Sequence, residues 1–271
     1  MKFGVYLPIA RDFSDPRLLA ELAVQAEEAG WDGFFVWDHL SLAPRGEPWP
    51  LADPWIALAA IAVSTERIRL GPLVTPLARR RPAKVARETV TLDRLSGGRL
   101  VFGVGSGGAD RSDFAALGED PNAHVRAEKL DEALQVVTGL WRGEAFTFHG
   151  KHFRVEETTF LPRPIQEPRI PIWVAGAWPR RAPARRAARW DGMFPISEDW
   201  PRERLTPDDY RAIREFIGRQ DFDLVFTTTW GHEGEPADVD AYAEVGVTWW
   251  LQEAQTAEDA RRRIAAGPPR T

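Results

Sequence analysis

The sequence predicts an α/β protein in which eight parallel strands, each followed by a helix, close into a (β/α)8 barrel. The first supporting observation is the length of 271 residues, because such a barrel typically needs about 250 residues. The second is an alternation of short apolar runs with helical patterns, which predicts parallel pairing through right-handed crossovers. The third is the apolar character of runs such as residues 170–175, which suits a sheet covered on both faces. We therefore expect one domain spanning residues 1–271.

Caps and turns separate the expected elements. Asp53-Pro54 and Thr206-Pro207 each supply a helix cap followed by proline at the first turn, and Gly30 can end the first helix. The expected strands are residues 2–8, 33–37, 68–74, 100–104, 170–175, 191–195, 223–229 and 247–252. The expected helices are residues 16–29, 55–64, 82–95, 122–141, 206–219, 236–244 and 256–265, with an Arg-rich helix after residue 178.

Residues 146–153 alternate polar and aromatic side chains around Gly150-Lys151. This pattern predicts a β-hairpin with a two-residue turn, a small excursion outside the main sheet before the fifth strand. His149 and His152 flank the turn but have no carboxylate at a suitable spacing in the sequence, so we expect no metal site there.

Composition excludes several classes of function. The chain has no cysteine, which excludes disulfides, thiolate metal sites, iron–sulfur clusters and cysteine nucleophiles. The net charge of -5 gives no reason to expect nucleic acid or an anionic membrane as a partner. No run of about 20 apolar residues predicts a membrane span, and the first residues lack a signal-peptide pattern. We expect a cytoplasmic protein that acts on a small molecule.

In such a barrel the active site lies at the carboxyl ends of the strands. That rule selects Pro8, Trp37-Asp38-His39, Thr75-Pro76, Gly105-Ser106-Gly107, Gly176-Ala177-Trp178, Pro195-Ile196, Trp230-Gly231 and Glu253. Only Asp38, His39 and Glu253 in this set ionise. A carboxylate beside an imidazole can bind, orient or protonate a substrate. The structural alternative is that Asp38 caps the loop and His39 only packs.

Two glycine-bearing segments suit a flat or phosphorylated ligand. Residues 103–108 match G-x-G-x-x-G, but no helix opens at the third glycine, so we do not expect a Rossmann site. Glycine there still lets the backbone approach a ring or phosphate. Gly176 leads into the Arg-rich helix, where Arg180 and Arg181 suit phosphate. A solvated basic helix face is the alternative.

Several segments together resemble the luciferase-like monooxygenase family of flavin- and deazaflavin-dependent oxidoreductases. The central match runs from Arg-Ile-Arg-Leu-Gly at residues 67–71 through Val-Thr-Pro to Leu-Asp-Arg-Leu-Ser-Gly-Gly-Arg at residues 92–99, and ends at Gly107. Residues 26–32, 37–39 and 171–176 support it. The similarity covers roughly residues 1–195. It implies a luciferase-like TIM barrel, and family members are commonly dimers, so a homodimer is an expectation.

The resemblance also implies where a cofactor would bind. The isoalloxazine or deazaflavin ring would rest on a third-strand bulge at Leu73, Val74 and Thr75, with a non-proline cis peptide between the first two. Gly105, Ser106 and Gly107 would border the ring and its tail. The loop at Gly176, Ala177 and Trp178 would hold the phosphate, although the family usually has a smaller residue than this tryptophan. Asp38 and His39 match a pair typical of the deazaflavin-using branch, which favours F420 over FMN.

The leading hypothesis is therefore an F420-dependent oxidoreductase that transfers hydride to or from a small organic substrate. His39 would donate or accept the proton, and Asp38 would orient it or bind the cofactor. One alternative is an FMN-dependent monooxygenase of the same family. A second is a non-catalytic flavin-binding protein, suggested by Trp178 and by the short stretch at residues 197–222. A barrel hydrolase that pairs Asp38 with Glu253 is disfavoured.

Overall fold

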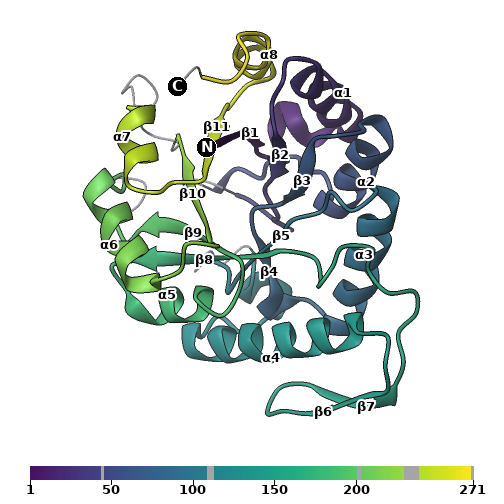
Figure 1. The fold of residues 1–271 in the computed structure, drawn as a ribbon. Coiled ribbons are helices and arrows are strands. Elements are labelled where there is room, and N and C mark those ends of the chain that lie inside the picture. Colours follow the sequence, from purple (N-terminus) through teal and green to yellow (C-terminus); the bar gives the residue numbers. More distant parts are fainter. Residues whose placement is uncertain (44–45, 109–112, 200–202, 229–237, 270–271) are drawn as a thin grey trace.

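The computed structural model describes residues 1–43, 46–108, 113–199, 203–228 and 238–269. Its main sheet is a ring of parallel strands surrounded by helices (Figure 1). The strands are β1 (Lys2–Leu7), β2 (Gly33–Val36), β3 (Arg69–Pro72), β4 (Thr75–Pro76), β5 (Phe102–Gly105), β8 (Ile172–Trp178), β9 (Gly192–Ser197), β10 (Asp223–Thr227) and β11 (Trp249–Glu253). They run in the order β3-β2-β1-β11-β10-β9-β8-β5-β4.

The ring closes between β3 and β5. Leu70 forms a parallel bridge with Leu100, and the Val101 N–H donates to the Leu70 carbonyl at 2.8 Å. β3 and β4 are two pieces of one strand, interrupted at residues 73–74, so nine segments make eight barrel strands. The predicted (β/α)8 barrel is confirmed.

The helices form the outer layer. They are α1 (Pro16–Glu28), α2 (Pro54–Ser64), α3 (Pro82–Leu95), α4 (Ala123–Trp141), α5 (Arg181–Ala187), α6 (Pro207–Ile217), α7 (Val239–Glu244) and α8 (Ala257–Ala265). Short 3-10 turns are η1 (Arg11–Ser14), η3 (Leu77–Arg79) and η4 (Ala115–Leu117). Asp53 accepts from two N–H groups at the start of α2, and Thr206 forms a capping box with Asp209. The predicted caps therefore set the helix starts. Among the described residues, no helix is both long enough and apolar enough to cross a bilayer.

Two apolar cores result from the alternation of side chains along the strands. The outer core lies between the strands and the helices. The inner core fills the barrel with Tyr6, Phe35, Leu73, Val101, Trp173, Phe194, Val225, Trp249 and Leu251. Four partly exposed residues cover it, namely Trp37, Val74, Ala175 and Ile196. The interior of the barrel is therefore filled by side chains.

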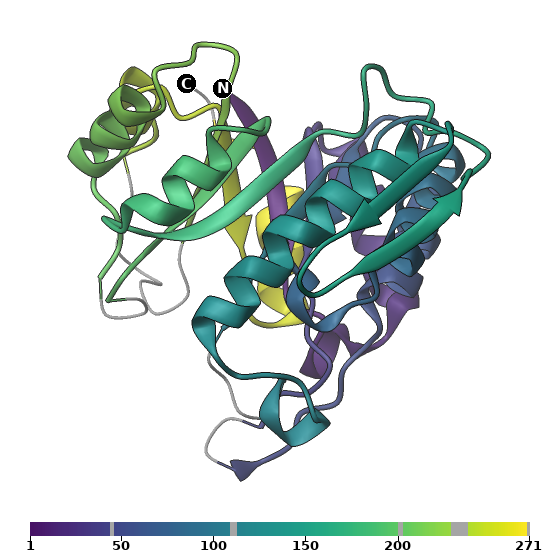
Figure 2. The same ribbon diagram turned by 90° about the horizontal axis from the view of Figure 1, so that it is seen from below.

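The hairpin consists of β6 (Phe146–His149) and β7 (Arg154–Thr158), and it lies against α4 (Figure 2). The expected turn at Gly150-Lys151 was wrong by one residue. His149 pairs with Arg154, and the Gly150 N–H donates to the Phe153 carbonyl at 2.9 Å, so Lys151 and His152 form the tip. The reason is a tertiary contact, because the Glu132 carboxylate on α4 accepts the N–H groups of Lys151, His152 and Phe153.

A few predicted bounds differ from the structure. The seventh strand ends at Thr227 and not at residue 229, which lies outside the described residues. Helix α7 begins at Val239, and the predicted start at residues 236–237 also lies outside them. The Arg-rich helix, α5, has only seven residues.

Candidate functional site

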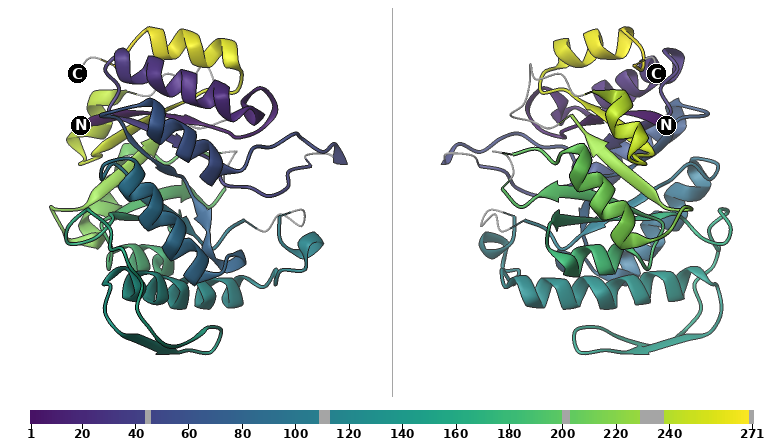
Figure 3. Two further views of the ribbon diagram at one scale, coloured as in Figure 1. Left: turned by 90° about the vertical axis from the view of Figure 1, so that its right-hand side faces the viewer. Right: turned by 60° about the vertical axis from the view of Figure 1, so that its left-hand side comes forward.

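The rim at the carboxyl ends of the early strands carries the candidate site. The described parts of the loops that follow β2 and β5 project from the same end of the barrel (Figure 3). His39 follows β2, and Asp113 follows β5. The alternation of β2 turns Trp37 toward the inner core, and His39 lies two residues beyond it on the rim.

His39 combines one buried and one accessible side. Its side chain is 32% exposed. Its Nδ1 atom is buried, forms no hydrogen bond of acceptable geometry, and lies 3.3 Å from Oδ2 of Asp113, a charge contact. The imidazole packs edge-on against the indole of Trp37, with ring centroids 5.9 Å apart. The accessible part of the ring is therefore the part remote from Nδ1.

Asp113 is a buried carboxylate that connects the two rim loops. One oxygen accepts the N–H groups of Leu40 and Ser41 at 2.8 and 3.4 Å, and the other faces His39 and lies 3.3 Å from Nη2 of Arg79. Burial acts to raise the pKa of Asp113. The contact with His39, the charge of Arg79 and the Leu40 N–H outweigh it, so the pKa lies below its usual value. Asp113 is thus a carboxylate that only accepts hydrogen bonds.

Asp38 lies in a buried ion-pair cluster that shares Arg79 with Asp113. Its Oδ1 accepts from Nη2 of Arg79 at 3.0 Å and from Nη2 of Arg80 at 2.8 Å. Its Oδ2 accepts from Nη2 of Arg80 and from the Thr75 hydroxyl, both at 2.8 Å. The side chains of Asp38 and Arg79 are fully buried. Both Asp38 oxygens are therefore occupied by fixed donors, which suits a carboxylate that holds the rim together.

The third-strand bulge lies where the resemblance implied. The peptide between Leu73 and Val74 is cis. The Leu73 N–H donates to the Val36 carbonyl at 2.8 Å, and the Leu73 carbonyl accepts the Tyr6 hydroxyl at 2.5 Å. Burial, and to a smaller extent the charge of Glu253, raise the pKa of Tyr6 well above its usual value. Tyr6 therefore stays a neutral donor that fixes this backbone.

Gly105 leaves a gap beside the bulge. A Cβ at this position would lie 2.9 Å from Cγ2 of Val74 and 3.7 Å from Cβ of Ala175. Ser106 and Gly107 follow it and are partly exposed. Only glycine leaves this space beside Val74 free, and the backbone of residues 105–107 borders it.

At the end of β8, Gly176 and the Trp178 side chain pack against the helices and do not border the space beside Val74. A Cβ on Gly176 would lie 2.1 Å from Cβ of Pro183 on α5, so this glycine permits the close packing of strand and helix. Trp178 is buried in the outer core, where its ring contacts Phe216 and lies under the guanidinium of Arg181. Its indole therefore points away from the inner core, and only its backbone is at the rim. Ala177 is partly exposed.

The two arginines favoured for phosphate binding both have partners. Arg180 forms an ion pair with Glu198 at 2.7 Å, and Arg181 lies over the rings of Trp178 and Phe216. Arg180 is the N-cap residue of α5 and makes no side-chain capping bond. Nothing in these contacts directs either guanidinium toward His39.

Glu253 and the seventh-strand end complete the predicted rim set. Glu253 is 8% exposed at the end of β11, and its N–H donates to the Thr228 hydroxyl at 2.9 Å. Trp230-Gly231 lies outside the described residues. A hydrolytic pair of Asp38 and Glu253 would need two carboxylates free to face one substrate, and the donors around Asp38 leave it no such freedom.

The comparison with protein families decides the assignment. The family model described as luciferase-like monooxygenase matches residues 1–269. The chain belongs to the luciferase-like monooxygenase family. Curated relatives include the F420-dependent glucose-6-phosphate dehydrogenase of Beutenbergia cavernae, 33% identical over 265 residues that span 94% of this chain and 71% of the relative. The enzyme of the same name from Nakamurella multipartita is 35% identical over 211 residues, 74% of this chain and 58% of that relative.

Solved structures of this luciferase-like fold agree along nearly the whole chain. An F420-dependent secondary alcohol dehydrogenase in complex with an F420-acetone adduct superposes with a TM-score of 0.79 at 17% identity, covering 99% of this chain and 98% of that one. The F420-dependent tetrahydromethanopterin reductase of Methanopyrus kandleri gives 0.74 at 18% identity, covering 97% of both chains. At these identities the likeness shows the fold.

The rim of this luciferase-like barrel fits a flat, mainly apolar ring. Partly exposed apolar surface comes from four residues in β8, in β9, directly after β2 and in the bulge between β3 and β4, namely Ala175, Ile196, Trp37 and Val74. Gly105 adds a space that a Cβ would fill. A flat ring needs apolar surface on one face and close backbone approach at its edge, and both are present.

Sequence reasoning missed the partner of His39. It placed the orienting carboxylate at Asp38, the neighbour in sequence, whereas the structure places Asp113 beside the imidazole. Arg79 and Arg80 were also not singled out. The available signal was position alone, because Asp113 lies in the loop after the fourth barrel strand and the arginines follow the bulge.

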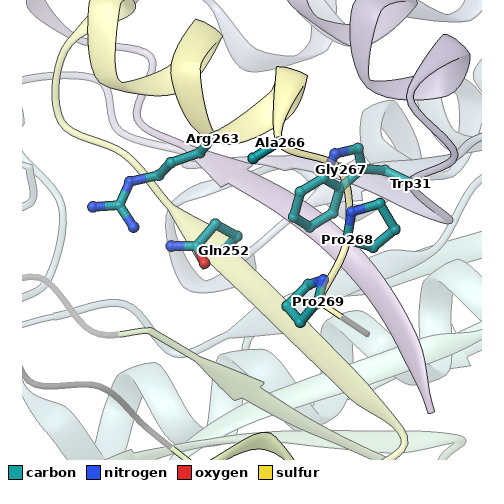
Figure 4. Close-up of a pocket in the computed structure, with 7 residues that line it drawn as sticks. All are labelled: Trp31, Gln252, Arg263, Ala266, Gly267, Pro268 and Pro269. Atoms are coloured by element: carbon teal, nitrogen blue, oxygen red, sulfur yellow. The ribbon is translucent and has the colours of Figure 1, made fainter. Parts of the chain in front are cut away.

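A separate depression of about 370 Å³ lies away from these residues, where the chain after α8 crosses β11 (Figure 4). It is lined by Trp31, Gln252, Arg263, Ala266, Gly267, Pro268 and Pro269. Its polar groups have partners, since Arg263 binds Asp259, the Gln252 amide donates to Thr228, and the Trp31 N–H donates to the Ile264 carbonyl. Of these contacts, the bond from Trp31 to Ile264 holds the end of α8 against the barrel.

Proposed function

We propose that this protein is an F420-dependent oxidoreductase that transfers hydride between the deazaflavin and a small organic alcohol or carbonyl compound. The observation that carries the proposal is the placement of His39. Its accessible ring edge lies on the rim beside the apolar surface of Trp37, and its buried Nδ1 faces Asp113. F420-dependent relatives and structural neighbours support the choice of cofactor.

Different rim residues would hold the cofactor and transfer the proton. Val74 and Ala175 would support the ring, and the backbone of residues 105–107 would line its edge. Bound F420 would supply a carbon that accepts or gives up hydride. His39 Nε2 would accept the hydroxyl proton when an alcohol is oxidised, and would return it when a carbonyl is reduced. Ala177 and the backbones of Gly176 and Trp178 would contact the cofactor tail.

The apolar rim also protects such a reaction. Water has no favourable partner on the surfaces of Trp37, Val74, Ala175 and Ile196 once a ring covers them. Asp38 would have a structural role. Its ion pairs with Arg79 and Arg80 fix the end of β2, from which His39 projects.

The test is a cofactor titration joined to a His39 variant. Purified protein is titrated with F420 and, separately, with FMN, and F420 reduction is then followed with primary alcohols, secondary alcohols and sugar phosphates. F420 is expected to bind more tightly. His39→Gln should lower turnover about 100- to 10,000-fold, the usual contribution of a general acid–base group, with cofactor affinity little changed.

His124→Gln is the matched control, since His124 is an exposed histidine at the start of α4. It should leave turnover unchanged. Tight binding of FMN alone would contradict the proposal and favour the monooxygenase alternative. Cofactor binding without reduction by any donor, in the wild type as in the variant, would favour a non-catalytic flavin-binding protein.

A further inference from the structure

The contacts of Asp113 assign it a role in setting the state of His39. We propose that Asp113 is the positioning residue of the site: it keeps the imidazole proton on Nδ1, so that Nε2 is left as the proton acceptor at the rim. The catalytic consequence of this inference rests on the proposed function. The tautomer of His39 itself can be measured in the protein without cofactor.

The first argument concerns donors and acceptors. Asp113 Oδ2 lies 3.3 Å from His39 Nδ1, and in the part of the chain that the structure describes no other carboxylate lies within ion-pair distance of this ring. A carboxylate only accepts hydrogen bonds, so the ring atom that faces it is stabilised as N–H. A neutral imidazole carries one proton, and therefore the other nitrogen becomes an acceptor. Because Nδ1 is buried while 32% of the side chain is exposed, that acceptor lies on the accessible side.

The second argument is that Asp113 holds the loop as well as the ring. Its Oδ1 accepts the N–H of Leu40, the residue after His39, at 2.8 Å, and that of Ser41 at 3.4 Å. The backbone that carries the imidazole is thus fixed by the same side chain that faces its Nδ1. A single side chain therefore contacts both the loop and the ring.

The third argument is that only a carboxylate satisfies this environment. Donors approach both oxygens: the backbone N–H groups on Oδ1, and His39 and Arg79 on Oδ2. An asparagine has one oxygen and one NH2 group, so one side would always place a donor against a donor. If the NH2 group faced His39, it would donate to Nδ1 and move the ring proton to Nε2.

The charged groups around His39 are balanced by this arrangement. Arg79 (on η3) contacts both Asp113 and Asp38, and Arg80 contacts Asp38. Two guanidinium groups therefore face two carboxylates. Removing the charge of Asp113 leaves Arg79 with Asp38 as its remaining carboxylate partner, and His39 with none.

The decisive experiment is nitrogen-15 NMR of the histidine rings in the protein without cofactor, at alkaline pH where histidine is neutral. The His39→Gln spectrum identifies the His39 signals. The wild type should show Nδ1 protonated and Nε2 unprotonated. Asp113→Asn should shift the ring to the other tautomer or to a mixture, and should speed hydrogen exchange at the Leu40 amide. An unchanged tautomer in Asp113→Asn would overturn the proposal.

Asp120→Asn is the matched control. Asp120 belongs to the same connection between β5 and α4, and its carboxylate accepts the N–H of Asn122 at 2.8 Å. The His39 signals should therefore stay as in the wild type. In the F420 assay, Asp113→Asn should lower kcat roughly 10- to 100-fold, less than loss of the acid–base group itself, with the KM for F420 changed far less. If the tautomer moves but no F420 turnover exists in the wild type, the proposed function fails while the positioning role stands.

Discussion

Two regions of the barrel rim differ in how they use their side chains: the early rim, at the ends of β2, β4 and β5, and the late rim, at the end of β8. At the ends of β2, β4 and β5, buried charged groups from three loops meet around Asp38 and Asp113. At the end of β8, the side chains are used for packing instead: Trp178 is buried in the outer core, and Gly176 accommodates Pro183 of α5. The early half therefore supplies the buried charged groups and the space beside Val74 and Gly105, whereas the side chains at the end of β8 serve the packing of strand against helix.

The largest expected effect comes from breaking the early-rim ion pairs. Asp38→Asn leaves Arg79 and Arg80 buried without their common carboxylate. Removing one partner of a buried pair typically costs about 3–5 kcal/mol, and we expect a loss of unfolding free energy in that range. Urea unfolding followed by circular dichroism measures it.

The control for this substitution is Asp53→Asn. Asp53 caps α2 through the N–H groups of Trp55 and Ile56, and asparagine caps helices about as well as aspartate. Its unfolding free energy should stay within about 0.5 kcal/mol of the wild type, as surface substitutions usually do. A loss for Asp38→Asn no larger than that of Asp53→Asn would show that the early-rim cluster contributes little to stability.

A glycine-to-alanine substitution should have different effects on stability and on F420 binding in the two halves of the rim. In Gly176→Ala the new Cβ meets the rigid ring of Pro183 at 2.1 Å, so α5 has to shift, at a cost of about 1–3 kcal/mol of stability. In Gly105→Ala the nearest atom is the end of the Val74 side chain at 2.9 Å, which can rotate. Stability should stay within about 1 kcal/mol. The Kd for F420 should rise about tenfold, or 1.4 kcal/mol.

Thermal unfolding measures the stability of both variants, and F420 titration measures their Kd for the cofactor. If Gly176→Ala weakens F420 binding more than Gly105→Ala while keeping full stability, the late rim holds the ring, and the division between the halves is wrong.

The smallest expected effect is the pH dependence of stability that Asp113 contributes. Its pKa in the folded protein is lowered, chiefly because the contact with His39 and the charge of Arg79 outweigh burial. The stabilisation is therefore complete above the ordinary value of 3.8 and is lost as the pH falls through the lower, folded value. The difference in unfolding free energy between wild type and Asp113→Asn should shrink as the pH falls below about 4. A difference that grows as the pH falls through this acidic range would contradict the sign of the shift.

Local patterns were sufficient to predict the barrel. The first N–H groups of a helix need hydrogen-bond acceptors, and a nearby side chain can supply them. Asp53 and Thr206 therefore mark helix starts independently of the tertiary structure. The hairpin turn shows the limit of such patterns. Gly150-Lys151 is a good two-residue turn in isolation, but the tip forms one residue later, at Lys151 and His152, whose N–H groups donate to Glu132 on α4.

For the site, the sequence determined which residues reach the rim, because a strand end is a local property: His39, Val74 and Gly105 all follow from the strand positions. Only the tertiary structure decided how their side chains are paired. Asp38 is the neighbour of His39 in the chain, yet successive residues at a strand end point in different directions, so Asp38 binds the arginines of the next loop. Asp113, 74 residues further along, comes to the imidazole because ring closure brings the ends of β2 and β5 to the same rim.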